Sequence, residues 1–144
     1  MSVPARSVPA ACALAGVAAG LVLGGCGGVR AADLFLLQRS GNVAGAKLTL
    51  LVNEEGGVRC NGGRTRKLSD PQLIEARVIT EDLRDPASHH LSLAPRPGAV
   101  LSYDVLTEKG RVRFADNSPG ARGALARLTV FVREVARRQC HLAR

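Results

Sequence analysis

The sequence predicts an α+β domain, in which an antiparallel sheet of about five strands carries two amphipathic helices on one face. Two patterns support this prediction. Short segments that alternate apolar and polar residues are separated by glycine-rich turns, which is typical of strands joined in hairpins. Two longer segments repeat apolar residues at helical spacing, one after the third strand and one at the end of the chain. A sheet with helices on one side buries both sets of apolar residues.

Three strands are predicted in the first half of the domain. Segment 33–41 ends at a glycine, segment 46–53 alternates apolar and polar side chains, and segment 57–61 is a short third strand. Gly41 and Gly45 bracket the connection between the first two strands, which favours a hairpin. Short turns between consecutive strands imply antiparallel pairing.

The first helix is predicted over 68–86. Ser69 fits the N-cap position, and Gln72, three residues later, completes a capping-box pattern. Pro86 is expected to end the helix because proline cannot continue it. The apolar stripe of this helix consists of Leu73, Ala76, Ile79 and Leu83.

A second hairpin, 101–116, and a closing helix complete the predicted domain. The hairpin turns at Gly110. Segment 117–121 is expected to start the helix, because Asx and serine side chains accept hydrogen bonds from helix-start amides and a proline suits the first turn. The alternative for the stretch 114–120 is an exposed binding loop. The apolar stripe of the helix consists of Leu125, Leu128, Val132 and Val135.

The first 25 residues have the pattern of a signal peptide. An apolar run from Ala10 to Leu23, too short to span a bilayer, follows a segment whose only charged side chain is Arg6. The run is followed by Gly24, Gly25 and Cys26. Together with Leu23 these residues resemble the lipobox of bacterial lipoproteins, which implies lipidation of Cys26 and cleavage just before it. An ordinary thiol beside a secretory cleavage site is the alternative. The resemblance divides the chain into a signal peptide at 1–25, a lipidated cysteine and tether at 26–32 and a single domain at 33–144, and it places the protein on the outer face of the bacterial cell membrane.

Two cysteines remain in the domain once Cys26 is acylated. An exported compartment permits disulfides, so Cys60 and Cys140 are predicted to pair, with two free buried thiols as the alternative. The bridge would join the third strand to the end of the last helix. Isolated cysteines lack the spacing of a zinc site.

The chain is basic, with 20 Lys and Arg against 12 Asp and Glu and a formal charge of +8. Nucleic acid is a poor partner, because the chain is exported and has no Trp, one Tyr and three Phe with which to stack bases. A predicted basic loop, 62–67, carries Arg64, Arg66 and Lys67. This loop is the candidate site for anionic cell-wall polymer or lipid headgroups.

No motif in the sequence predicts catalysis, a cofactor or a metal. His89 and His90 are adjacent loop residues without a carboxylate at ligand spacing, and no serine lies in a nucleophile elbow. Asp104 and Asp116 could approach each other across the second hairpin, although hairpin aspartates usually lie in turns or on the solvent face. We therefore expect a non-enzymatic protein.

Two family resemblances add to this interpretation. The lipobox with the segments LTLLVN, VRCNGG, SYDV and VRFADNSPG is similar to a group of small actinobacterial lipoproteins of unknown function. The order of an RSGNVAG segment, a helix, a hairpin ending in Asp and a final helix resembles emfourin, a proteinaceous inhibitor of thermolysin-like metalloproteases. The matching residues are Arg39, Ser40, Gly41, Gly45, Asp116 and Pro119. The cysteines, signal peptide and third strand depart from the emfourin pattern.

Taken together, these features predict a lipid-anchored, extracytoplasmic binding module. One hypothesis is an emfourin-like inhibitor whose contact surface is 39–45 together with 114–120, including Asn117. The alternative is an accessory or structural lipoprotein that binds anionic polymer or headgroups through its basic loop.

Overall fold

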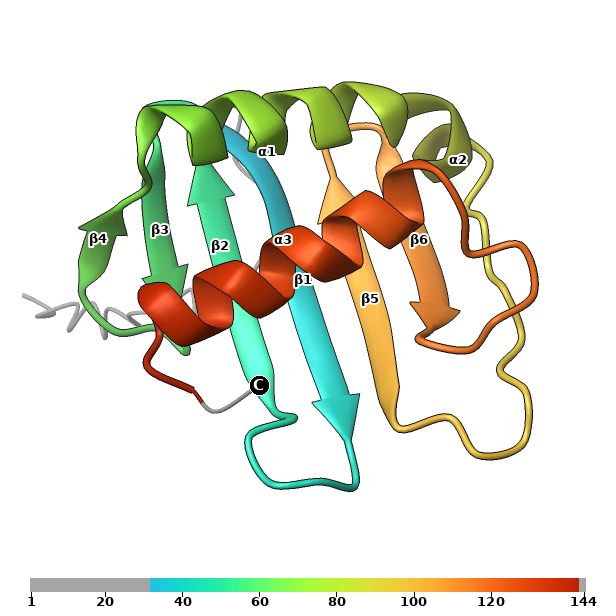
Figure 1. The fold of residues 1–144 in the computed structure, drawn as a ribbon. Coiled ribbons are helices and arrows are strands. Elements are labelled where there is room, and N and C mark those ends of the chain that lie inside the picture. Colours follow the sequence, from blue (N-terminus) through green and yellow to red (C-terminus); the bar gives the residue numbers. More distant parts are fainter. Residues whose placement is uncertain (1–31, 143–144) are drawn as a thin grey trace, which may run out of the picture.

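One antiparallel sheet forms the framework of the computed structural model, which describes residues 32–142. The predicted α+β class is confirmed, with six strands in the order β4-β3-β2-β1-β5-β6 within the described residues (Figure 1). The predicted signal peptide and Cys26 lie outside this range. The strands are β1 (Asp33–Gly41), β2 (Leu48–Asn53), β3 (Gly57–Cys60), β4 (Thr65–Lys67), β5 (Leu101–Thr107) and β6 (Gly110–Ala115).

The strand absent from the prediction is β4. Its backbone pairs antiparallel with β3, with Arg66 opposite Val58 and Thr65 opposite Arg59. Part of the predicted basic loop is therefore the edge strand of the sheet. The Arg66 guanidinium donates to the Gln139 carbonyl oxygen, which ties this edge to the chain just after the last helix.

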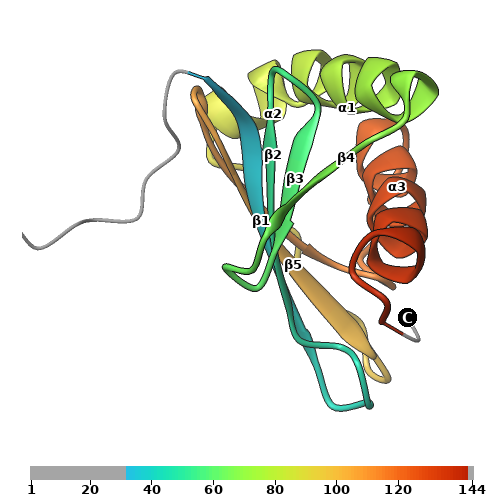
Figure 2. The ribbon, with the colours of Figure 1, turned by 90° about the vertical axis from the view of Figure 1, so that its left-hand side faces the viewer.

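Two longer helices, α1 (Asp70–Asp82) and α3 (Ala124–Arg138), lie on the same face of the sheet (Figures 1 and 2). The predicted capping box of α1 is confirmed, since the Gln72 amide and the Ser69 amide each bond the other residue's side chain. α1 ends before Pro86, and the chain continues as the short helix α2 (Arg84–Ser88). Pro86 lies in the first turn of α2, where a missing amide hydrogen costs nothing.

The predicted start of the last helix is wrong. α3 begins at Ala124, and its N-cap residue is Gly123, which has no side chain that could cap the helix. The polar side chains of Asp116, Asn117 and Ser118 do not cap the helix, because they bond the loop before β5.

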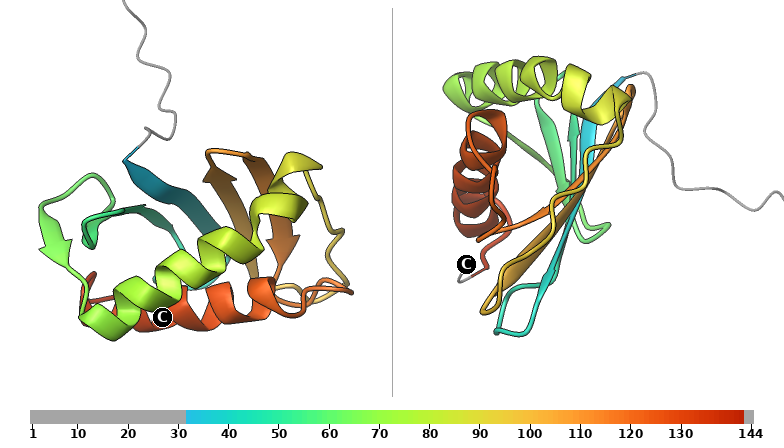
Figure 3. Two further views of the ribbon diagram at one scale, coloured as in Figure 1. Left: turned by 90° about the horizontal axis from the view of Figure 1, so that it is seen from above. Right: turned by 90° about the vertical axis from the view of Figure 1, so that its right-hand side faces the viewer.

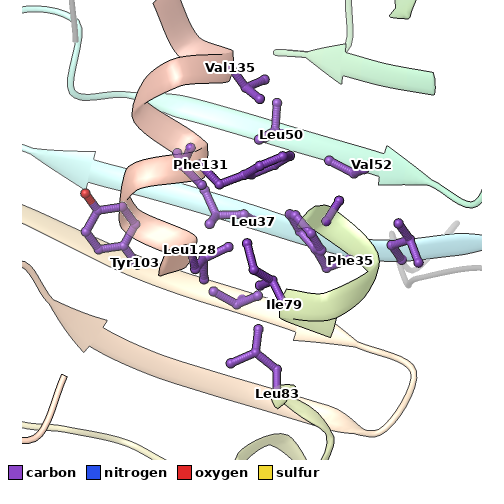
Figure 4. Packing of buried hydrophobic residues seen from close by; sticks show 14 of the residues in the cluster. Phe35, Leu37, Leu50, Val52, Ile79, Leu83, Tyr103, Leu128, Phe131 and Val135 are labelled. Atoms are coloured by element: carbon purple, nitrogen blue, oxygen red, sulfur yellow. The ribbon is translucent and has the colours of Figure 1, made fainter. Parts of the chain in front are cut away.

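The core lies between the helices and the sheet (Figure 4). Phe35 of β1 meets Phe131 of α3 edge-to-face, with ring centroids 6.2 Å apart. Edge-to-face pairs add to the stabilisation from apolar burial. The fully buried aliphatic residues around them are Leu37, Leu48, Leu50, Val52, Val58, Ile79, Leu83, Val105, Val112, Leu128, Val132 and Val135.

The predicted disulfide is confirmed. Cys60, the last residue of β3, is bonded to Cys140, which follows α3, and their Cα atoms are 5.7 Å apart. The bond joins the sheet layer to the helix layer near the edge of the sheet that carries β4. No helix within residues 32–142 has the length and apolar character needed to cross a membrane.

Candidate functional site

The predicted contact residue Arg39 points into the protein. Its side chain follows the helix-covered face of β1 and is only 3% exposed. Nε donates to the Ala46 carbonyl oxygen at 2.9 Å and Nη2 to the Gly45 carbonyl oxygen at 2.8 Å. Burial lowers the pKa of the guanidinium. Tyr103, the residue of β5 that is paired with Arg39, opposes that shift. Arg39 therefore stabilises the β1–β2 connection from inside the protein. Any contact between this connection and a partner would be made by neighbouring residues.

Three other predicted contact residues in the segment 39–45 differ in their surroundings. Ser40 is exposed. A side chain at Gly41 would place its Cβ 2.3 Å from the Val100 carbonyl oxygen, so only glycine fits there. Gly45 has a φ of 73°, in the left-handed region that glycine adopts at no steric cost.

Asp116 and Asn117 also act within the fold. The Asp116 carboxylate accepts from the backbone amides of Val100 and Leu101, both at 3.2 Å. The Asn117 side chain both accepts from the Arg96 amide and donates to the Arg96 carbonyl oxygen, each at 3.0 Å. These bonds fasten the loop before β5. They also keep Asp116 away from Asp104, which contacts Arg111 and Arg113 on the sheet.

The structure brings two of the predicted segments together and leaves the third apart. Gly41 approaches Val100, and Asp116 binds the amide of the same residue, so 39–45 and 114–120 meet at one end of the sheet. The basic residues Arg64, Arg66 and Lys67 lie at the β4 edge, three strands away from β1. They do not form one surface with the two loops.

The face of the sheet opposite α1 and α3 was missed by sequence reasoning. Neither of these helices covers it, as two side views show (Figures 2 and 3). We call it the open face. Its polar residues are the outward-pointing positions of the alternating strands, and the strand register arranges them in rows. One row across β2, β1, β5 and β6 consists of Thr49, Gln38, Asp104 and Arg113.

The neighbouring row on the open face is apolar in its middle and cationic at its ends. Leu51, Leu36 and Leu106 lie side by side and are partly exposed. Arg59 of β3 is paired with Leu51, and Arg111 of β6 is paired with Leu106. The leucine row is therefore flanked by two guanidinium groups.

A hollow of about 660 Å³ lies over the polar row. The segment before β5 forms one wall, because Leu93 and Leu91 exchange backbone hydrogen bonds with Arg113 at 2.8 Å. The lining residues that carry hydroxyl, amide or charged groups are Gln38, Arg39, Ser40, Lys47, Thr49, Asn61, Ser92, Ser102, Tyr103, Asp104 and Arg113, and the apolar ones are Leu48, Leu93, Pro95, Phe114 and Ala115. We call it the open-face hollow.

Charge on the open face is mainly positive. Asp104 accepts from Arg111 at 3.2 Å and from Arg113 at 3.1 Å, so its carboxylate is shared by two cations. Lys47 and Arg59 are exposed and form no ion pair with any residue between 32 and 142. Two of these four cations, Arg111 and Arg113, contact Asp104, and the other two, Lys47 and Arg59, lie on the β2 and β3 side of the face.

Acidic side chains gather at a different place. They are carried by the start of β1, by α1 and α2, and by the β2–β3 and β5–β6 turns, which lie along one edge of the molecule (Figure 1). These residues are Asp33, Glu54, Glu55, Asp70, Glu75, Glu81, Asp82, Asp85 and Glu108. Five of these carboxylates form ion pairs with Arg77, Arg84, Lys109 or Arg127. The edge where β1 begins therefore carries both signs of charge with more carboxylates than paired cations, whereas the open face is mainly basic.

A second hollow, of about 590 Å³, lies between α1 and α3. It combines the apolar side chains of Val130 and Phe131 with the charged side chains of Glu75, Arg127 and Glu134. Arg127 reaches Asp82 of α1, so part of this charge is used in joining the helices. Within residues 32–142, no three His, Cys, Asp or Glu side chains are grouped so as to hold a metal ion.

Comparison of the chain with family models, curated proteins and solved structures gives no match.

Proposed function

We propose that this protein is an extracytoplasmic bacterial lipoprotein, anchored through Cys26, whose domain is a non-enzymatic binding module. The observation that carries the binding role is the open face, a polar and hollowed side of the sheet that α1 and α3 leave uncovered. The disulfide supports export, because such bonds form and persist outside the cytosol. The lipobox supplies the attachment, since acyl chains added to a protein hold it stably at a membrane when two or more are present.

The chemistry of the open-face hollow favours binding over catalysis. Among residues 32–142, no histidine or cysteine lines the hollow, and Asp104 is its one carboxylate. General acid–base catalysis needs a group that is free to exchange a proton with the substrate. Two arginine side chains bond Asp104, so its carboxylate serves to orient cations.

Protease inhibition is a second candidate, because 39–45 and 114–120 meet at one end of the sheet. The contact would be made by Ser40 and the turn that follows it, since Arg39 is turned inward. Titration of a thermolysin-type metalloprotease with the oxidised domain tests this candidate. Stoichiometric inhibition would support it, and full protease activity at high molar excess would exclude it.

The anchor is tested by labelling cells with an alkyne analogue of palmitate. Wild-type protein should be labelled and recovered with membranes, and Cys26→Ser should lose the label. Cys12→Ala is the matched control, because Cys12 lies in the predicted signal peptide and should leave labelling unchanged. Equal labelling of wild type and Cys26→Ser would contradict the proposal.

A further inference from the structure

We propose that the open face binds an anionic polysaccharide, a chain of sugar hydroxyls that also carries carboxylate or phosphate groups. The inference rests on the proposed function and names the ligand class of the binding module. The first observation concerns polar side chains of the open-face hollow that do not help to hold the fold together. Gln38, Ser40, Ser92 and Ser102 make no side-chain hydrogen bond to other residues of the described range, although all four are exposed. Amide and hydroxyl groups both donate and accept, which matches the donors and acceptors of sugar hydroxyls.

The cations of the open face supply the second part of the match. Lys47 lies on the wall of the hollow and Arg113 lies across it on β6. Arg59 and Arg111 flank the adjacent leucine row. Guanidinium groups bind carboxylate and phosphate in a bidentate geometry. Asp104 contacts the guanidinium groups of Arg111 and Arg113 and so holds both in place, which reduces the side-chain entropy lost when a ligand binds.

The extent of the hollow favours a chain over a single sugar. Its polar row crosses β2, β1, β5 and β6. Three strand spacings of about 4.8 Å give the row a width of about 14 Å. A polymer that lies along this row would reach Lys47 at one end and Arg113 at the other.

The location of the hollow favours a polysaccharide over a lipid headgroup as the ligand. An anchor at Cys26 would enter the domain at Asp33, at the edge where the carboxylates gather. Ser40, at the hollow, lies seven residues further along β1, which corresponds to about 23 Å of extended strand. This edge has no surplus of cations for anionic headgroups, because its Arg and Lys side chains pair with carboxylates, whereas the basic open face lies further from the anchor and can reach polymer outside the membrane.

The proposal is tested by calorimetric titration of the unacylated chain from Gly27 to Arg144. All strands, helices and core residues described here lie within 32–142, so this chain keeps the whole domain and its disulfide. The probes are hexagalacturonate, which carries carboxylates, a phosphomannan fragment, which carries phosphates, and neutral maltohexaose. We expect at least one anionic probe to bind and the neutral probe to bind at least tenfold more weakly.

Variants test whether binding occurs at the open face. The double substitution Lys47→Gln and Arg59→Gln should raise Kd about tenfold or more, because neither side chain forms an ion pair with another residue of 32–142 and both are available to a ligand. Arg133→Gln with Arg137→Gln is the matched control. It removes the same charge from the exposed side of α3, so it should change Kd less than twofold. Ser102→Leu keeps the charge and fills part of the hollow, so it should also weaken binding.

Three results would overturn the proposal: no binding of either anionic probe, equal weakening by the two double variants, or unchanged binding in Ser102→Leu. Binding to vesicles of phosphatidylglycerol through Lys47 and Arg59, without binding to the glycans, would also overturn it. The titration uses unacylated protein, so failure here concerns the ligand class alone. Failure of the palmitate labelling would concern the anchor.

Discussion

Asp116 binds the backbone amide of Leu101, fifteen residues earlier in the chain, at 3.2 Å. The same carboxylate binds the amide of Val100, and the backbone amide of Asp116 donates to the Leu101 carbonyl oxygen at 2.9 Å. The aspartate therefore closes the loop that precedes β5 onto the end of β6. Because that loop forms a wall of the open-face hollow, its anchoring shapes the hollow as well as the fold.

Asp116→Ala should destabilise the domain by about 1 kcal/mol, because two charge-assisted hydrogen bonds are lost at a site that water can reach. Urea unfolding followed by circular dichroism measures the change. Glu55→Ala is the control, since Glu55 is exposed and makes no ion pair within the described residues. Equal stability of the two variants would contradict a role of Asp116 in holding the loop.

Arg39 should affect stability more than surface recognition. Arg39→Lys should lower the free energy of unfolding by about 1 to 3 kcal/mol, because lysine cannot reproduce the planar fork that bonds the carbonyl oxygens of Gly45 and Ala46. Ser40→Ala, at the exposed neighbour, should stay within about 0.5 kcal/mol of wild type. Urea unfolding separates the two variants. A stable Arg39→Lys domain with altered partner binding would reverse the assignment of Arg39 to the fold.

The periodic elements could be predicted from sequence because each carries its own pattern. The capping box of α1 is local, and the apolar stripe of α3 depends only on residues three and four apart. β4 could not be predicted in the same way. All three of its residues are exposed, so no alternation marks it, and it is a strand only because β3 offers an unpaired edge.

Long-range bonds explain the other differences. Asp116, Asn117 and Ser118 match a helix start, but the loop before β5 provides the amides and carbonyl groups that they bond. The open face depends on the same kind of information. Gln38 and Asp104 are far apart in sequence and become neighbours only because β5 pairs with β1. Sequence alternation marks both as polar positions without showing that they share a row.

The disulfide should contribute a large part of the stability of the domain. Cys60 and Cys140 are 80 residues apart, and the chain-entropy model assigns about 4 to 5 kcal/mol to a loop of this length. The whole stability of a domain of this size is about 5 to 15 kcal/mol, so the paired substitution Cys60→Ser with Cys140→Ser should shift the urea midpoint strongly. Wild type treated with a reductant should unfold at the same urea concentration as the double variant. The Arg66–Gln139 hydrogen bond joins the same two layers, so Arg66→Gln in the double variant should add a smaller loss. A double variant as stable as the oxidised protein would show that the core holds the two layers together without the bridge.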